Sequence, residues 1–340
     1  MPSFCRHGRL EANCPICSKQ AKELQVRPAR TVRRPASAGA GASASTATKR
    51  RHARQAGDLR VRRVARAADD GYEHELVPGL RASADAARLA DELAFSAARL
   101  DELTSDPPGA YAEVALADDV EEAVWLAFLI AYLSPLEDDE PFASIDAVRT
   151  MWATGEIPDL DSVRTGPRTA HDPRRGAETV LAYRGWAARA GSQAAALQGD
   201  ASWAPERRFE RAYERLSLKG FGRAARYELL VTLGRLGVFD LRPTSLHLVE
   251  PLDPTVVAAK RVFGIGDAMN LRRRSAALAN EAGLPIEALD LALVNWSGQM
   301  ELPPGRERIT AGARVTGADR RGAIAELLGV EGPEPEPEDE

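Results

Sequence analysis

From about Val77 onward, apolar residues recur three or four positions apart, which is the spacing of one face of an α-helix. Ser83 is a candidate N-cap for the first predicted helix. The apolar stripe of this helix consists of Leu89, Leu93, Ala97, Leu100 and Leu103. The segment Asp106-Pro-Pro-Gly109 then breaks the chain, and segments with the alternation of a β-strand are scarce. The pattern predicts an all-α domain over residues 77–300, followed by a C-terminal extension over residues 301–330.

Two stretches inside this domain are strongly helical. "AVWLAFLIAYL" (Ala123–Leu133) is apolar throughout, so we expect a helix that is buried on all sides and begins at Asp118 or Asp119. A run from Gly176 to Gln198 is alanine-rich and is predicted to be helical. Between them, Glu137-Asp-Asp-Glu140 could bind a divalent cation. A hydrated loop between helices is the alternative interpretation.

The charge is distributed unevenly along the chain. The formal net charge is −5, but residues 18–66 hold 14 Lys and Arg against two acidic residues, a local charge of +12. The last ten residues, "EGPEPEPEDE", contain six acidic side chains and predict a disordered acidic tail. Residues 26–70 are rich in Arg, Ala, Ser, Gly and Pro and too poor in apolar residues to form a core, which predicts a disordered basic linker.

Two basic clusters in this linker, "TKRRHAR" (Thr48–Arg54) and "LRVRRVAR" (Leu59–Arg66), are suited to the phosphate backbone of a nucleic acid. A solvated tether, or an arm that associates with the acidic tail, would have the same composition. No stretch resembles a secretory signal or a membrane span, because the longest apolar run has 11 residues where a spanning helix needs about 20. We therefore expect a cytoplasmic protein with reduced thiols and no membrane partner.

All three cysteines of the chain lie in its first 17 residues. Cys5, His7, Cys14 and Cys17 provide four donors with a Cys-x2-Cys pair, the spacing of a structural zinc site. The metal would supply the folding energy of a zinc-knuckle-like module over residues 1–25. A redox dithiol or free cysteines are the alternatives, but a redox pair would leave Cys5 and His7 without a role. Such a module is suited to docking on a protein or a nucleic acid.

A helical hairpin is predicted over residues 208–237. Leu218-Lys-Gly-Phe-Gly222 separates two amphipathic helices, and its glycines permit a tight turn with positive φ. Phe221 can pack in the seam between the helices. The backbone amides at the start of the second helix would then form an anion site, flanked by the charges of Lys219, Arg223 and Arg226. An ordinary interhelical turn is the alternative.

The hairpin resembles the helix-hairpin-helix of the DNA glycosylase superfamily, most closely over Phe209–Asp240 and more loosely over Val262–Gly298. Within it, the pairing of the hairpin with "ALDLALVNWSG" looks most like the alpha-glutamyl/putrescinyl thymine pyrophosphorylase clade, which implies action on modified thymines in DNA. The resemblance implies DNA contacts by the residues of the turn and the following helix. These are Lys219, Gly220, Phe221, Gly222, Arg223 and Arg226.

The resemblance also implies site residues. Asp240 lies 18 positions after Gly222, near the place of the glycosylase aspartate, although the spacing is shorter and the usual flanking residues are missing. A cap or turn role before Pro243 is the alternative. Ala224 stands where members that cut the strand have lysine, so a lyase step is not expected. No cysteine follows the domain, which excludes an iron–sulfur cluster in its usual position, and Asp290 is a secondary candidate by resemblance alone.

Weaker candidates complete the set. His171 and His247 could act as bases, Phe263-Gly-Ile-Gly-Asp267 could contact a second phosphate, and Trp296 could stack on a base. The alternatives are core or surface histidines, a helix start and a core tryptophan. Three functional hypotheses result: an enzyme that acts on a modified or extruded base in DNA, without lyase activity; a DNA-binding protein without catalysis; and a helical protein unrelated to DNA.

Overall fold

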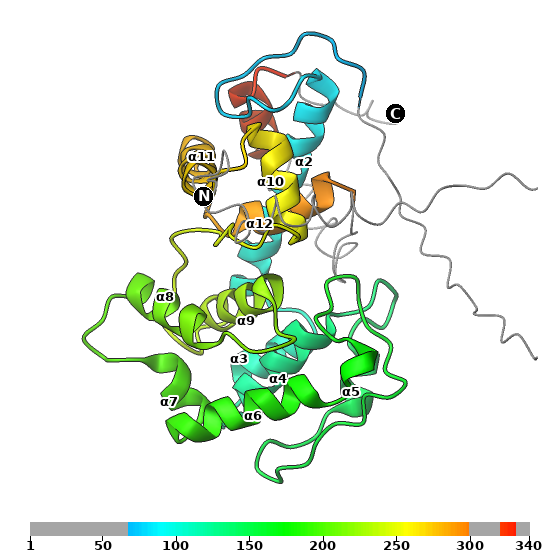
Figure 1. The fold of residues 1–340 in the computed structure, drawn as a ribbon, viewed down its shortest axis with the longest axis vertical. Coiled ribbons are helices and arrows are strands. Elements are labelled where there is room, and N and C mark those ends of the chain that lie inside the picture. Colours follow the sequence, from blue (N-terminus) through cyan, green and yellow to red (C-terminus); the bar gives the residue numbers. More distant parts are fainter. Residues whose placement is uncertain (1–66, 299–319, 331–340) are drawn as a thin grey trace, which may run out of the picture. The chain divides into compact units, whose positions relative to one another are not determined.

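The computed structural model describes residues 67–298 and 320–330. These residues form helices and connecting loops with no β-strand, only an isolated bridge between Leu218 and Phe221, so the predicted all-α class is confirmed for this part of the chain. Figure 1 shows the helices in chain order, and residues 320–327 form a further helix. The elements are α2 (Ser83–Ser105), α3 (Ala110–Leu116), α4 (Val120–Leu133), α5 (Ala143–Val148), the 3-10 helix η2 (Pro173–Arg175), α6 (Glu178–Ala190), α7 (Gln193–Gln198), α8 (Pro205–Arg215), α9 (Arg223–Arg235), α10 (Pro254–Phe263), α11 (Ala268–Glu281) and α12 (Ala288–Trp296).

Helix α4 is the buried helix predicted from the sequence. Every residue from Ala123 to Leu133 is buried, and the Asp119 side chain caps the helix by accepting from the Glu121 amide at 2.8 Å. Its aromatic residues form the centre of a stack, in which the ring of Phe128 lies 3.8 Å from that of Tyr183 in α6. Helix α4 packs against α3 and also against α9, which is the second helix of the hairpin.

The structure changes one predicted helix limit and divides one predicted helical run. Helix α2 starts one residue before the expected position, because Ala82 is its N-cap and Ser83 is already helical. The run from Gly176 to Gln198 is two helices, since Gly191 and Ser192 end α6 and start α7. The Ser192 hydroxyl accepts from the Ala195 amide at 3.0 Å, the bond that caps α7.

Helices α2 and α12 pack extensively against each other, and α10 also packs against α12. Helix α9 also contacts α2, so it lies between the α2/α12 pair and α4. This arrangement brings residues that are distant in sequence to the first turn of α9, where Arg223 contacts Asp253 and Asp290. None of the helices in the described ranges combines the length and apolarity that crossing a bilayer requires.

Candidate phosphate-binding groove

The turn between α8 and α9 has the tight geometry predicted for it. The Phe221 amide donates to the Leu218 carbonyl at 3.1 Å, and Gly220 has a φ of +84°. A side chain at Gly220 would also collide with Thr179 Oγ1 of α6, so both the dihedral angle and the space require glycine. Phe221 is buried and packs on the α4 aromatics, with its ring 5.2 Å from that of Phe128. The turn is therefore fixed to the core by the side chain at its tip.

The backbone amides in the first turn of α9 differ in exposure: Gly222 is exposed and Ala224 half-buried, whereas Arg223 and Ala225 are buried. Gly222 is the N-cap and provides no side-chain bond. Within the described ranges, no acceptor takes the amides of Gly222, Arg223, Ala224 or Ala225. Free amides at a helix N-terminus carry partial positive charge and favour an anion. The amides thus lack an acceptor among the described residues, but only Gly222 and Ala224 lie at the surface, and the predicted phosphate site stays a prediction.

An open groove of about 700 Å³ lies over these amides. Three segments line it: residues 168–170, residues 217–226 apart from Lys219, and residues 250–253. This volume is within the range of about 300–1,000 Å³ that ligand sites occupy. Charged side chains reach the groove from each segment, namely Arg168, Arg226, Glu250 and Asp253.

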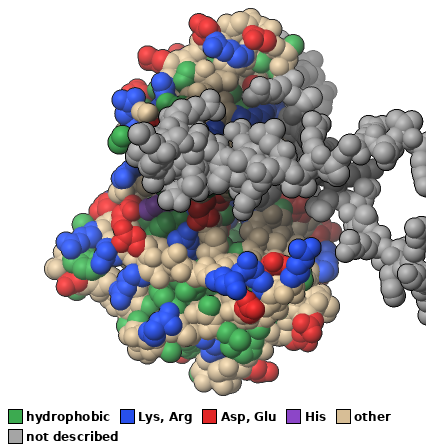
Figure 2. All heavy atoms as spheres, viewed as in Figure 1, with side chains coloured by type: hydrophobic (Ala, Val, Ile, Leu, Met, Phe, Trp, Pro, Cys, Tyr) green, Lys and Arg blue, Asp and Glu red, His purple; other side chains and the backbone are tan. Residues whose placement is uncertain are grey.

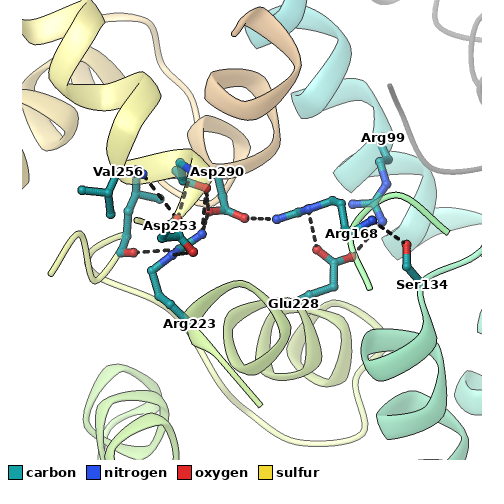
Figure 3. A network of polar contacts seen from close by, with 10 residues as sticks. Arg99, Ser134, Arg168, Arg223, Glu228, Asp253, Val256 and Asp290 are labelled. Atoms are coloured by element: carbon teal, nitrogen blue, oxygen red, sulfur yellow. Dashed lines mark hydrogen bonds and ion pairs between the residues drawn. The ribbon is translucent and has the colours of Figure 1, made fainter. Parts of the chain in front are cut away.

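A buried network of ion pairs forms the floor of the groove (Figure 3). Arg223 lies at one end, with its Nη2 donating to Asp290 Oδ1 at 2.7 Å and its Nε 2.9 Å from Asp253 Oδ2. Asp290 Oδ2 accepts from Arg168 Nη2 at 2.6 Å. Arg168 Nη1 in turn donates to Glu228 Oε2 at 3.0 Å.

The network continues to α2, where Arg99 Nη2 donates to Glu228 Oε1 at 3.0 Å. It joins side chains from α2, α9, α12, the loop before η2 and the residue that caps α10 (Figure 3). Three arginines face three carboxylates, so their formal charges cancel. Such a network costs desolvation energy and stabilises only when every partner is in place.

Asp290 and Glu228 stay ionised although they are buried. Burial raises the pKa of Asp290, but the charges of Arg223 and Arg168 more than offset this, and the pKa lies below its usual value. The same balance holds for Glu228, whose pKa is lowered by Arg99 and Arg168 against the effect of burial. The arginines are therefore held in fixed positions by charged partners.

The structure corrects the role predicted for Arg223. Its side chain is 0% exposed and points into the network, so it does not offer its charge to a phosphate on the surface. Lys219 is 76% exposed and ion-paired with Glu178 at 3.5 Å, in the position expected for an outer contact. Arg226 lies between these extremes. Its side chain is 11% exposed, stacks over the Tyr213 ring and pairs with Glu250 at 2.6 Å.

Asp240 is not brought to the groove. Asp240 follows the C-terminal end of α9, whereas Gly222 caps its N-terminal end. At 1.5 Å per residue the helix between them is about 20 Å long. The Asp240 side chain is 63% exposed and lies 3.6 Å from Arg208. It lines a separate pocket of about 420 Å³ together with Arg235 and Glu287. Its catalytic role stays a prediction.

Two of the weaker candidates, Trp296 and Asp267, have contacts of a core residue and of a helix cap. Trp296 is buried, with its indole nitrogen donating to the Asp85 carbonyl at 2.8 Å, which agrees with a core role. Asp267 caps α11 by accepting from the Asn270 amide at 2.9 Å, as expected for a helix start. The Glu137–Glu140 run is a loop after α4, and no group of metal-ligating side chains occurs in residues 67–298 or 320–330.

The two histidines have partners that the sequence did not reveal. His171 is buried, with Nδ1 3.0 Å from the Tyr132 hydroxyl, and burial lowers its pKa. His247 stacks on Tyr213 at 3.8 Å, and its Nε2 lies 3.4 Å from Glu210. The predicted zinc ligands Cys5, His7, Cys14 and Cys17 lie outside the described residues.

Residues 168–299 match the family model of alpha-glutamyl/putrescinyl thymine pyrophosphorylase, clade 3. The match covers less than half of the chain, but it begins at Arg168 and contains the hairpin, the groove and Asp290. No curated protein and no solved structure matches the chain. The similarity agrees with the pyrophosphorylase clade expected from the hairpin and the "ALDLALVNWSG" helix.

Sequence reasoning missed Arg168, Glu228, Asp253 and Glu250. Asp253 carried a readable signal, because Asp-Pro-Thr is a helix start, and its Oδ1 accepts from the Thr255 amide at 2.9 Å. The inward direction of Arg223 was also readable. It lies one turn before Tyr227 and two turns before Leu230, both fully or almost fully buried, so it continues an apolar stripe. Arg168 and Glu250 are loop residues without any such pattern.

Proposed function

We propose that the protein is a DNA-binding enzyme that modifies a thymine-type base. A nucleophile, water or an amine, forms a bond to the base carbon that carries a pyrophosphate group, the bond from that carbon to the pyrophosphate oxygen breaks, and the proton of the nucleophile passes to solvent. Pyrophosphate then leaves into the groove over the α8–α9 turn.

The observation that carries this proposal is the first turn of α9, whose amides at Gly222–Ala225 have no acceptor among the described residues. Its surface residues Gly222 and Ala224 line a groove together with Arg168 and Arg226. A pyrophosphorylase must hold a group with several negative charges. Backbone amides and arginines in a fixed arrangement stabilise such a group as its charge develops.

The residues of the groove have different roles in this proposal. The α9 amides bind phosphate oxygens, and Arg226 provides a guanidinium at the rim. Asp290 and Glu228 position Arg168, whose two terminal nitrogens they accept at 2.6 and 3.0 Å. Asp253 Oδ2 lies 2.9 Å from Arg223 Nε and so holds that arginine, while Oδ1 caps α10. These residues hold and orient the anion, and Lys219 contacts the strand outside the groove.

A non-catalytic DNA-binding protein is the alternative, and the buried network argues against it. A binding turn needs only exposed amides and cations, whereas six buried charges are costly unless they position something. We also retain two proposals for parts of the chain outside the description. Cys5, His7, Cys14 and Cys17 hold a structural zinc ion, and the basic linker adds nonspecific affinity for DNA. The α8–α9 unit serves as a helix-hairpin-helix.

On the face drawn in Figure 2, basic side chains are interspersed with acidic and apolar ones rather than gathered in one broad patch. Contacts with the DNA backbone by the residues of this face are therefore expected to be few and local. In a titration of duplex binding against salt, Lys219→Ala should reduce the slope of log K against log[salt] by roughly one.

Nucleoside analysis by mass spectrometry tests the catalytic part. DNA containing modified thymines, including pyrophosphorylated ones, is incubated with the full chain and with Arg168→Lys, which keeps the charge but cannot bond both carboxylates in the same way. We expect converted nucleosides with the wild type and a large loss of product with the variant, with DNA binding retained. Binding without conversion across the panel would support the non-catalytic alternative.

A further inference from the structure

His247 has a backbone conformation that few side chains adopt. Its φ is +51°, and Ser134 is the only other non-glycine residue with a positive φ in the described ranges. Two hydrogen bonds hold the chain there. The Val249 amide donates to the His247 carbonyl at 2.8 Å, and the buried Arg223 donates to the Leu246 carbonyl at 3.0 Å. Such strain persists where the surroundings fix a residue, and it is concentrated at functional sites.

The strained backbone places the imidazole ring of His247 against the hairpin. The ring stacks on Tyr213 of α8, with centroids 3.8 Å apart and an interplanar angle of 16°. The guanidinium carbon of Arg226, on α9, lies 4.5 Å from the centroid of the same tyrosine ring. Tyr213 therefore contacts both side chains, and it connects His247 with an arginine that lines the groove.

Arg226 has to keep its place while its charged partner changes. In the free protein it pairs with the Glu250 carboxylate at 2.6 Å. An anion in the groove competes with Glu250 for this guanidinium, whereas the attraction between the cation and the Tyr213 ring is available in both states. Because His247 packs on Tyr213, it also supports Arg226.

Charged and titratable groups from three helices face the His247 ring. Its Nε2 lies 3.4 Å from Glu210 Oε2 of α8, with the two side chains 14% and 33% exposed. Glu210 Oε1 accepts from the Thr244 hydroxyl at 3.0 Å, and the charge of Arg272 on α11 also acts on this carboxylate. Tyr227 of α9 meets the imidazole edge-on, with centroids 6.4 Å apart. Glu210 is thus placed to stabilise a protonated imidazole.

We propose that His247 is a positioning residue of the groove, which fixes Arg226 through Tyr213 and takes up a proton when an anion with several negative charges binds. This inference rests on the proposed function, because it takes the groove to be the pyrophosphate site. It adds that pyrophosphate binding is linked to a proton and is therefore tighter at acid pH than fixed charges alone would make it. His247 itself does not contact the anion or the base.

The sign of this linkage follows from the charges around the ring. Arg226 and Arg272 disfavour a proton on His247, whereas Glu210 and Glu250 favour it, so these four charges formally cancel. Pyrophosphate bound beside Arg226 adds negative charge, which stabilises the imidazolium relative to the neutral ring. Because linkage is reciprocal, the protein that carries this proton binds the anion more tightly.

Calorimetric titration with inorganic pyrophosphate counts the protons. Each titration of the full chain is run in two buffers with different enthalpies of ionisation, at several values between about pH 5 and 8, where histidines change their charge. The difference in heat gives the protons taken up on binding. The wild type is compared with His247→Asn, because asparagine also adopts a left-handed conformation. His74→Asn is the matched control, since His74 lies before α2 and is not among the residues that line the groove.

We expect the wild type to take up at most about half a proton more than His247→Asn, the value for a tenfold linkage. The affinity lost in His247→Asn should grow as the pH falls through this range. The proton exchange of pyrophosphate itself is common to both titrations. In an Arg226→Gln background, His247→Asn should cost less affinity than in the wild type, because both residues act through the Tyr213 ring. The control should behave as the wild type does.

Glu210→Gln keeps the histidine and its backbone, so it provides a second test if His247→Asn does not fold. The amide oxygen still accepts from Thr244, but the carboxylate charge that stabilises the imidazolium is gone. The pH at which proton uptake is greatest should therefore move to a lower value than in the wild type.

Equal proton uptake by the wild type and His247→Asn at every pH would overturn the inference. So would fully additive losses of affinity for His247→Asn and Arg226→Gln, or an unchanged uptake maximum in Glu210→Gln. In each of these cases the wild type still binds pyrophosphate, so the proposed function stands. A wild type that does not bind pyrophosphate would contradict the proposed function and this inference together.

Discussion

The carboxylate of Asp290 joins two arginines, and its bond with Arg223 is among the most deeply buried charged contacts in the described residues. The two atoms are 2.7 Å apart, and the side chains are 4% and 0% exposed. The other carboxylate oxygen accepts from Arg168 at 2.6 Å. One residue of α12 thus sets the position of an arginine beneath the groove and of another at its edge.

Asp290→Asn should destabilise the protein strongly. The amide removes the negative charge between two buried guanidinium groups, and breaking a buried ion pair in this way costs about 3–5 kcal/mol. Urea unfolding measures the change. Asp101→Asn is the matched control, since its partner Arg320 lies at 2.9 Å but the Asp101 side chain is 57% exposed. The control should lose less than about 1 kcal/mol, and equal losses would contradict the account.

The network should also make stability sensitive to acid. The folded-state pKa values of Asp290 and Glu228 lie below their ordinary values of 3.8 and 4.5, because the arginines outweigh burial. Their contribution to the free energy of unfolding is therefore fully present at pH values above these ordinary pKa values. It is lost as the pH falls from there through the lower pKa values of the folded state. Unfolding free energies measured over this range should fall less steeply for Asp290→Asn. Parallel curves would show that Asp290 does not carry this dependence.

Gly220→Ala should disrupt the hairpin turn more than a positive φ alone would. Alanine at +84° has an unfavourable backbone conformation, and its Cβ would also collide with Thr179 Oγ1. Gly237→Ala is the control, with a φ of +73° and no atom near the added Cβ. The control should cost about 1–2 kcal/mol of unfolding free energy, and Gly220→Ala clearly more. Equal costs would show that Thr179 moves away freely.

The sequence predicted the elements of the site better than it predicted their partners. The buried helix α4 and the glycine turn follow from local patterns, namely an apolar run and two glycines between amphipathic helices. The inward direction of Arg223 follows the apolar stripe of α9, but its partners Asp290, which is 67 positions away, and Asp253 do not. No local pattern specifies a contact over that distance. Arg168 could not be predicted for the same reason. It is a loop arginine, and its place in the site depends on side chains that are distant in the sequence.

Glu250→Gln should strengthen anion binding in the groove. The Glu250 carboxylate pairs with Arg226, and its Oε2 lies 3.9 Å from where a Cβ on Gly222 would be, close to the free amides. Removing this charge frees Arg226 and ends the repulsion of an incoming phosphate. Calorimetric titration with inorganic pyrophosphate should show tighter binding. Glu113→Gln is the matched control, because Glu113 pairs with Arg149 at the same distance of 2.6 Å on α3. Unchanged or weaker binding by Glu250→Gln would mean that Glu250 does not compete for the site.

The most direct test of the anion site places a negative charge at its centre. Ala224→Asp does this in the first turn of α9, where an acidic residue stabilises the helix by about 0.3–1 kcal/mol, so a loss of binding would not reflect unfolding. Ala84→Asp makes the same change in the first turn of α2. Calorimetric titration of inorganic pyrophosphate should show binding to the wild type and to Ala84→Asp, and at least about tenfold weaker binding to Ala224→Asp. Equal binding by all three proteins, or none by the wild type, would contradict the assignment of the α9 amides as the phosphate site.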